Sequence, residues 1–417
     1  MKKLFSNKLY VATLISDTVS NLGDILFYLA LMSYVLQVPE TKLAISLIGI
    51  SEMLPMLFGV LLGYFADRFP NKVNGILLSQ VLRAILYSLL GLAMGWRPAL
   101  WIALFAIGIN LISDLAGAFE NALFIPVSLR LVADEDRAQA LGISSALTQL
   151  GRVVFNSAGA VLLTWFSYQT IAFLNAGTFM IAAGIIFSIK PLLNHLFTDR
   201  PLLSAEKINQ ASTFSLRQFK ATFNLAIKEI FAIPVIKGVM IVAPLLNAVA
   251  AGIQTIFVLQ LNNQPNFILV NPAVSLAAFT TILSLGSILG SLLVDKLFGR
   301  MNLKAIFILD IILTTLIYVF MLLGNSYGVL ICLFSMGISM GAVNPKLNAL
   351  IINTLSEDKI AMVTNAISTY FTAMMAIAQF ILSSLILLFA AETLLWGLIL
   401  LSLLLLGYTM TMKAVEV

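Results

Sequence analysis

Long apolar segments separated by short polar breaks run along the whole chain. A helix that crosses a bilayer needs about 20 mostly apolar residues, and each of these segments reaches that length. The pattern therefore predicts an all-α integral membrane protein with twelve membrane-spanning helices, near residues 10–36, 44–66, 73–95, 99–130, 138–165, 168–190, 232–261, 273–294, 302–323, 327–354, 361–390 and 392–412.

One long polar segment divides the spans into six and six. The predicted domains are an N-terminal six-helix bundle over 1–190, a cytoplasmic linker over 191–231 and a C-terminal six-helix bundle over 232–417. Within the linker, apolar residues recur at helical spacing between Phe214 and Ile230. This spacing predicts an amphipathic helix on the membrane surface, with partner binding as the alternative.

Composition supports a membrane protein and argues against an enzyme. The chain has 417 residues, of which 60% are apolar and 10% charged, whereas soluble domains are about 25% charged. The single cysteine, Cys332, and the single histidine, His195, exclude an internal disulfide and a clustered Cys/His metal site. The sequence also lacks a phosphate-binding Gly-x4-Gly-Lys-Ser/Thr loop. We therefore expect no cofactor, no ATP-driven step and no nucleic-acid partner.

The distribution of Lys and Arg predicts the orientation. With the first tail in the cytoplasm, 19 of the 24 basic residues fall on the cytoplasmic side and only Lys42 and Arg97 fall outside. By the positive-inside rule, both termini are cytoplasmic. The first apolar segment is too long for a cleaved signal peptide and contains Asp17 and Asp24.

Two landmarks recur between the halves. Asp67 follows the second span and Asp295 follows the eighth, 228 residues later, while Asp136 and Asp358 are 222 residues apart after the fourth and tenth spans. Nearly equal offsets indicate that the halves are structural duplicates, as in transporters built from parallel repeats. We therefore predict two pseudo-symmetric bundles.

The segment from Gly63 to Lys72 resembles the signature loop of the major facilitator superfamily, roughly G-x-x-x-D-R-x-x-x-K, between spans two and three. The resemblance implies that a gate on the cytoplasmic side involves Asp67, Arg68 and Lys72, with Asp295 in the weaker second copy. Gly63 is expected to permit close helix packing. The alternative is that these charges only set topology.

Further motifs resemble the macrolide-efflux type of exporter within that superfamily. They are Ser20 to Asp24 in the first span, Arg83 in the third, and Pro126 to Arg137 at the end of the fourth. Two positions depart from the drug:proton antiporters. Asn110 stands near the place where they often carry an intramembrane Arg, and the segment from Phe155 to Gly159 replaces their usual Gly-Pro pair.

Polar residues gather on one face of the first and fourth spans. At 100° per residue, Asp17, Asn21, Asp24 and Tyr28 form one narrow stripe on a helix that is otherwise apolar. The fourth span repeats this arrangement and the seventh and tenth spans do so more weakly. The resemblance implies that these four spans line a central cavity, and the candidate substrate residues are Asn21, Tyr28, Asn121, Asn247, Gln254 and Asn348.

Six carboxyl groups fall inside predicted spans: Asp17, Asp24, Glu52, Asp114, Glu120 and Asp310. Each costs about 2.5–3.5 kcal/mol at the membrane centre on insertion scales unless it is paired or protonated. We expect Asp17 and Asp310 to form interhelical hydrogen bonds or ion pairs, with Arg83 and Arg152 as available partners. The proton-coupling candidates are Asp24, Glu52, Asp114 and Glu120.

Three functional hypotheses stay open. The first is a secondary transporter that exports amphipathic organic compounds or drugs in exchange for protons, by alternating access. The second is a carrier or flippase for a specific metabolite or lipid-like molecule. The third is a transporter-shaped sensor or partner protein. We expect a monomer in a bacterial plasma membrane, in contact with lipids, protons and a small-molecule substrate.

Overall fold

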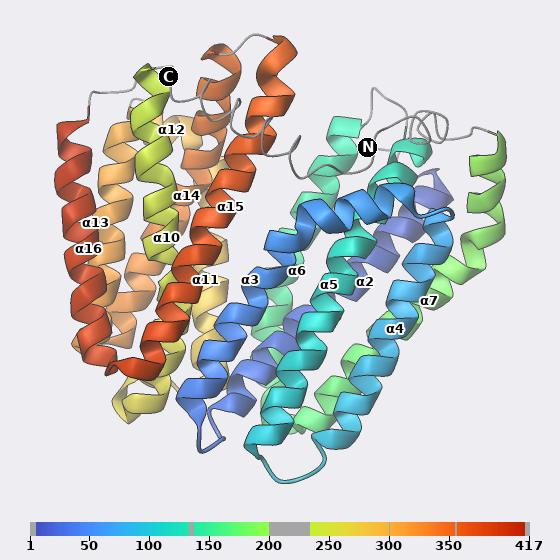
Figure 1. The fold of residues 1–417 in the computed structure, drawn as a ribbon, viewed down its shortest axis with the longest axis horizontal. Coiled ribbons are helices and arrows are strands. Elements are labelled where there is room, and N and C mark those ends of the chain that lie inside the picture. The colour runs from blue at the N-terminus through green and yellow to red at the C-terminus, as the bar shows by residue number, and fades with distance from the viewer. Residues whose placement is uncertain (1–5, 133–136, 200–233, 300, 355–356, 413–417) are drawn as a thin grey trace. The chain divides into compact units, whose positions relative to one another are not determined.

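The computed structural model describes residues 6–132, 137–199, 234–299, 301–354 and 357–412. Six long helices precede the gap at 200–233 and six follow it (Figure 1). The first six are α2 (Lys8–Val35), α3 (Thr41–Arg68), α4 (Lys72–Ala93), α5 (Leu100–Leu131), α6 (Arg137–Trp165) and α7 (Tyr168–Asp199). The others are α10 (Pro234–Asn263), α11 (Pro272–Leu292), α13 (Leu303–Leu322), α14 (Ser326–Thr354), α15 (Glu357–Leu388) and α16 (Ala391–Thr411).

The all-helical prediction is confirmed, since the described residues contain no strand. Eleven of the long helices are long and apolar enough to cross a membrane, while α6 contributes a shorter apolar part, Leu150–Trp165. Two short helices, η2 (Pro265–Phe267) and α12 (Val294–Phe298), lie between the long ones. The amphipathic helix predicted over 214–230 lies outside the described residues, and the three-part domain division stays a prediction.

Asparagine side chains begin four of the long helices. Asn7, Asn71, Asn271 and Asn302 precede α2, α4, α11 and α13, and each side-chain oxygen accepts a hydrogen bond from a backbone N–H in the first turn. These N–H groups have no partner within the helix, so an Asn cap fixes where the helix starts. Short polar breaks in the sequence thus become defined helix ends.

The chain forms two compact units. Unit 1 comprises the described residues within 1–40 and 54–214, and unit 2 those within 41–53 and 215–417. Helix α3 is therefore shared, because residues 41–53 pack with unit 2. There the Ser46 hydroxyl donates a hydrogen bond to the Ser383 carbonyl of α15.

Each unit has its own apolar core. In unit 1, Val73 and Ile76 of α4 pack with Leu123 and Val127 of α5. In unit 2, Val239 of α10 packs with residues of α13 and α16. Because these apolar side chains are buried, polar side chains of the same helices contact one another inside each unit.

Candidate functional site

The side chain of Arg83 lies at the centre of unit 1. It is 3% exposed and projects from the middle of α4. Its Nε donates a hydrogen bond to the Ser113 hydroxyl at 2.9 Å, and Nη1 donates to the Ser20 hydroxyl at 3.2 Å. A buried guanidinium needs hydrogen-bond partners for its N–H donors, and α2 and α5 contribute the partners of Arg83.

Two carboxyl groups pair with this guanidinium. Nη2 of Arg83 forms an ion pair with Oδ2 of Asp24, and Nη1 lies 3.5 Å from Oε2 of Glu120. Glu120 is buried, at 2% exposed, while the Asp24 side chain is 26% exposed. Two of the predicted coupling residues, from α2 and α5, thus meet at one cation.

Gln80 completes the network, and the sequence analysis did not identify it. Its amide Nε2 donates to Oε1 of Glu120 at 2.8 Å and to the Ser16 hydroxyl at 3.2 Å. Gln80 precedes Arg83 by three residues, so both lie on one face of α4. The sequence signal that could have identified Gln80 is the i, i+3 spacing of two polar residues in an apolar span.

Phe179 and Gly117 shape the space around the guanidinium. The Arg83 Cζ atom lies 4.1 Å from the centre of the Phe179 ring, which is the distance of a cation–π contact. A Cβ atom added at Gly117 would lie 3.2 Å from the Arg83 Cζ atom. Gly117 thus leaves room on α5 for a side chain that comes from α4.

A cavity of about 190 Å³ opens beside this network. Its lining includes four carboxyl groups and a single cationic side chain, that of Arg83. The carboxyls belong to Asp17, Asp24, Asp114 and Glu120. Within the lining, Asn21 donates to Asp17 at 3.1 Å, and Asn110, which lies outside the lining, donates to Asp114 at 2.7 Å.

A second cavity in unit 1, of about 300 Å³, adjoins the first. The two share Asp17 and Asn121 in their linings. The other residues of the larger cavity are mainly apolar and come from α2, α5 and the start of α6, among them Leu14, Phe124 and Ile125. Unit 1 therefore contains a carboxyl-rich space next to an apolar one.

Some predicted residues are not part of the Arg83 network or of these two cavity linings. Glu52 lies in the part of α3 that packs with unit 2, and Tyr28 is half-buried on α2 outside the cavity linings described above. Arg152, expected as a partner for the carboxyls, is exposed on α6. The expected partner of Asp17 was on another helix. In the structure, its carboxyl instead accepts a hydrogen bond from Asn21 of its own helix.

The predicted residues of the second half are separate from one another. Asn247 lines a cavity in unit 2 together with Asp310, whereas Gln254 is half-buried two turns further along α10. The side chain of Asn348 lies outside the described residues. The expectation that Asp310 is ion-paired or hydrogen-bonded between helices is only partly met, because its Oδ1 atom has no hydrogen-bond partner among the described residues.

The predicted gate loop is held by Lys72. Its buried ammonium donates to the carbonyls of Ala66, Asp67 and Phe69 at 2.6, 2.6 and 3.0 Å, so all three N–H donors serve the turn between α3 and α4. The Asp67 side chain is exposed. Arg68 instead lies over the Tyr64 ring, with Cζ 3.6 Å from its centre.

The expectation that Gly63 permits close helix packing is wrong in this structure. A Cβ atom built on Gly63 meets no described atom within 4 Å, so Gly63 does not mediate close helix packing here. The side chain of Asp295, the counterpart in the second half, lies outside the described residues. The gate itself stays a prediction from the resemblance.

The chain matches known proteins over nearly its whole length. A family model described as the Major Facilitator Superfamily matches residues 9–379. An uncharacterized MFS-type transporter of Bacillus subtilis (strain 168), YfiS, is 30% identical over 193 residues. That alignment covers 45% of this chain and 43% of the relative, so the chain matches less than half of the relative's length.

Solved structures share the fold at low sequence identity. A mutant of the nucleoside transporter NupG superposes with a TM-score of 0.71 at 14% identity, covering 96% of this chain and 99% of that one. A mutant peptide transporter POT in complex with alafosfalin gives 0.62 at 12% identity, with 96% and 95% covered. A bacterial homolog of the human lysosomal transporter Spinster gives 0.57 at 15%, with 96% and 94% covered.

Proposed function

The chain belongs to the major facilitator superfamily, and from this premise we propose that it exports amphipathic organic cations in exchange for protons. Membership makes it a multi-pass membrane transporter, of a kind that generally works by secondary transport rather than as an enzyme. The coupling ion, the cargo and the direction are the proposal. The direction rests on the resemblance to the macrolide-efflux type in the segments around Asp24 and Arg83.

The excess of carboxyl groups over cations in the unit 1 cavity carries the proposal. The lining contains four carboxyls and one guanidinium, so full ionisation would leave three negative charges without a compensating cation in the lining. Uncompensated charge in a low-dielectric site is costly, and such a site takes up protons or a cation. A proton and a cationic cargo can therefore compete for the same carboxyls.

The neighbouring apolar cavity supports an amphipathic cargo. A ligand with its cationic group near Asp17 would have its apolar part beside Leu14 and Phe124, because Asp17 belongs to both linings. Purely polar solutes would leave the larger cavity unused. This arrangement favours an exporter of amphipathic compounds over a carrier for a strongly polar metabolite.

Arg83 sets how many carboxyls remain available for exchange. It compensates one charge of the Asp24 and Glu120 pair, and Gln80 supports the ionised form of Glu120 by donating a hydrogen bond. In drug:proton antiporters the buried Arg is often found on the fourth span. Here α4, the third span, supplies the guanidinium, and its Nε bonds to Ser113 on the fourth.

Transport by purified protein in liposomes tests the proposal. We expect the parent to accumulate the permanently cationic dye ethidium against its gradient when only a pH difference is imposed, with a matching change of internal pH. The variants Asp24→Asn and Glu120→Gln should each lose at least about 90% of this uphill movement, because one exchangeable proton site is removed. Downhill movement of the dye should remain.

Glu392→Gln is the matched control, since it removes an exposed carboxyl at the start of α16. It should transport as the parent does, and all variants should elute as one species on size exclusion. Uphill dye accumulation by the double variant Asp24→Asn with Glu120→Gln at the parental rate would contradict the proposal. The coupling site would then lie elsewhere, with Asp114 and Glu52 next to be replaced.

A further inference from the structure

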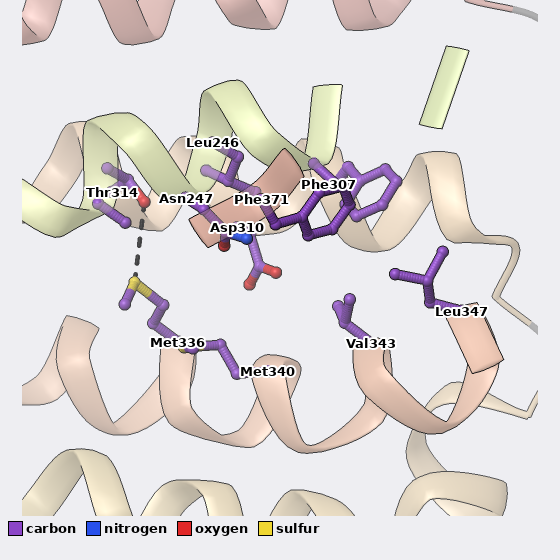
Figure 2. Close-up of a pocket in the computed structure, with 12 residues that line it drawn as sticks. Leu246, Asn247, Phe307, Asp310, Thr314, Met336, Met340, Val343, Leu347 and Phe371 are labelled. Atoms are coloured by element: carbon purple, nitrogen blue, oxygen red, sulfur yellow. Dashed lines mark hydrogen bonds between the residues drawn. The ribbon is translucent and has the colours of Figure 1, made fainter. Parts of the chain in front are cut away.

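A cavity of about 90 Å³ lies inside unit 2, and its lining includes no residue of the Arg83 network (Figure 2). Helix α10 contributes Asn247, and α13 contributes Phe307 and Asp310. Helix α14 contributes Met336 and Met340, and α15 contributes Phe371. Asp310 is the one ionisable side chain of this lining, which is otherwise aromatic, thioether, aliphatic, amide or hydroxyl in character.

The carboxyl group of Asp310 is buried without a compensating cation. Asp310 is 4% exposed, and its Oδ1 atom has no hydrogen-bond partner among the described residues. The hydroxyl of Ser339 on α14 lies near the carboxyl, but it has no hydrogen-bond partner among the described residues and contributes no positive charge. Figure 2 shows the carboxyl pointing from α13 toward the side chains of Met336 and Met340.

Three basic side chains of the helices around the cavity are described by the structure, and each is exposed or bonded to a backbone carbonyl. Lys304 on α13 donates to the carbonyls of Met410 and Met412, and Lys346 on α14 donates to the carbonyl of Met301. Lys237 on α10 is exposed. Among the described residues, none of these three compensates Asp310. An ionised Asp310 thus needs a cation that the described side chains do not provide.

The lining suits an organic ammonium group better than a metal ion. The described residues contain no group of three or more His, Cys, Asp or Glu side chains that could hold a metal. The Thr314 hydroxyl is also engaged, because it donates to the Met336 sulfur at 3.7 Å. Aromatic faces attract ammonium groups, and Phe307 and Phe371 line the same small space as the carboxyl.

We propose that the Asp310 cavity of unit 2 binds the primary ammonium group of an amphipathic amine. The ammonium pairs with the Asp310 carboxylate, and the first carbons of the amine lie against Phe307 and Phe371. The cavity volume of about 90 Å³ is small, so we expect it to favour this head group over a bulky quaternary cation. The site stands independently of proton coupling in unit 1.

Binding exchanges a proton for the amine. Without a ligand, the protonated carboxyl avoids an uncompensated buried charge. When R–NH3+ enters, the carboxyl releases its proton to water and the two charges pair, so one cation replaces another and the cavity stays neutral. Asp310 is the one titratable group of the lining, so at most one proton should be released for each amine bound.

Calorimetry on the purified full-length chain in detergent tests the site. The probe is phenethylammonium at pH 7.5, titrated in two buffers of different ionisation enthalpy, and phenethyl alcohol is its neutral analogue of equal size. We expect Asp310→Asn to weaken phenethylammonium binding at least about 10-fold and to abolish the proton release. Binding of the alcohol should be the same in parent and variant.

Two further variants separate the outcomes. Glu392→Gln removes an exposed carboxyl of unit 2 and should leave binding unchanged. Equal affinity of the parent and Asp310→Asn for phenethylammonium would overturn the proposal. Loss of amine binding in Glu120→Gln, with binding kept in Asp310→Asn, would assign the amine to unit 1. Displacement of the amine by sodium but not by choline would assign the cavity to an alkali metal ion. Asp310→Asn keeps the side-chain volume and cannot ionise, so a thermal midpoint at or above that of the parent is expected.

Discussion

At the scale of single residues, one guanidinium organises unit 1. The sequence identified Asp24 and Glu120 as candidates because carboxyls are rare in membrane spans, and it named Arg83 as an available partner for buried carboxyls. Arg83 was also part of the motif that resembles macrolide-efflux exporters, but the sequence could not predict that both carboxyls meet Arg83, because this depends on the rotation of three helices about their axes. Gln80 was missed for the same reason, since an uncharged amide gives little signal in a single sequence.

Replacing Arg83 tests how strongly the network depends on its cation. In Arg83→Gln, Asp24 and Glu120 lose their positive partner, and removal of one member of a buried ion pair costs about 3–5 kcal/mol. We expect this loss of stability at pH 8. At pH 5 the loss should be smaller, because protonated carboxyls no longer need the guanidinium. Thermal unfolding in detergent at the two pH values measures both effects.

A second substitution provides the control for this prediction. Glu120→Gln in the Arg83→Gln background removes one of the two uncompensated carboxyls, so it should restore part of the lost stability at pH 8. Asn74→Gln, on the exposed side of α4, should change the midpoint little. A deficit that is the same at both pH values, and is not relieved in the double variant, would mean that Arg83 acts by packing alone.

At the scale of helices, close backbone contact between α11 and α14 depends on glycine. A Cβ atom added at Gly290 would lie 1.9 Å from the Ile338 carbonyl oxygen, and one added at Gly337 would lie 2.4 Å from the Leu283 carbonyl oxygen. Small residues permit such contact between membrane helices. These neighbours are backbone atoms, so they cannot turn aside as a flexible side chain would.

Gly290→Ala should therefore destabilise the protein although alanine is the better helix former. Overpacking of a tight site costs about 1–3 kcal/mol, which exceeds the roughly 1 kcal/mol that alanine gains over glycine in a helix. Gly184→Ala on α7 is the matched control, because its added Cβ meets no described atom within 4 Å. We expect a lower thermal midpoint for the first variant and an unchanged or higher one for the second. The reverse order would contradict a glycine-dependent contact.

Helix boundaries were predictable from the sequence, whereas helix contacts were not. The predicted span 10–36 corresponds to Lys8–Val35 and the predicted span 302–323 to Leu303–Leu322, whereas the span predicted at 168–190 ends nine residues before the end of the helix Tyr168–Asp199. Long apolar runs and Asn caps mark these ends locally. The association of residues 41–53 with unit 2 depends on contacts far apart in the chain, such as that between Ser46 and Ser383.

At the scale of the whole molecule, the distribution of basic residues predicts the orientation in the membrane. Of the 24 Lys and Arg, 19 fall on one side in the twelve-span arrangement, and cytoplasmic loops are the ones enriched in these residues. The family match does not test which side is cytoplasmic. The turn after α3, where Lys72 holds three carbonyls, should therefore face the cytoplasm, and the turn after α2 should face outward.

Single cysteines can measure this orientation because the chain has only Cys332, which is buried. In a Cys332→Ala background, Glu40→Cys lies between α2 and α3 and Asn74→Cys lies in the first turn of α4, both at exposed positions. In intact bacterial cells, a membrane-impermeant maleimide should label Glu40→Cys and leave Asn74→Cys unlabelled until the membrane is permeabilised. The Cys332→Ala parent should stay unlabelled throughout. Labelling of Asn74→Cys in intact cells, with protection of Glu40→Cys, would reverse the orientation, so that a carrier using the unit 1 cavity would be loaded from the opposite side.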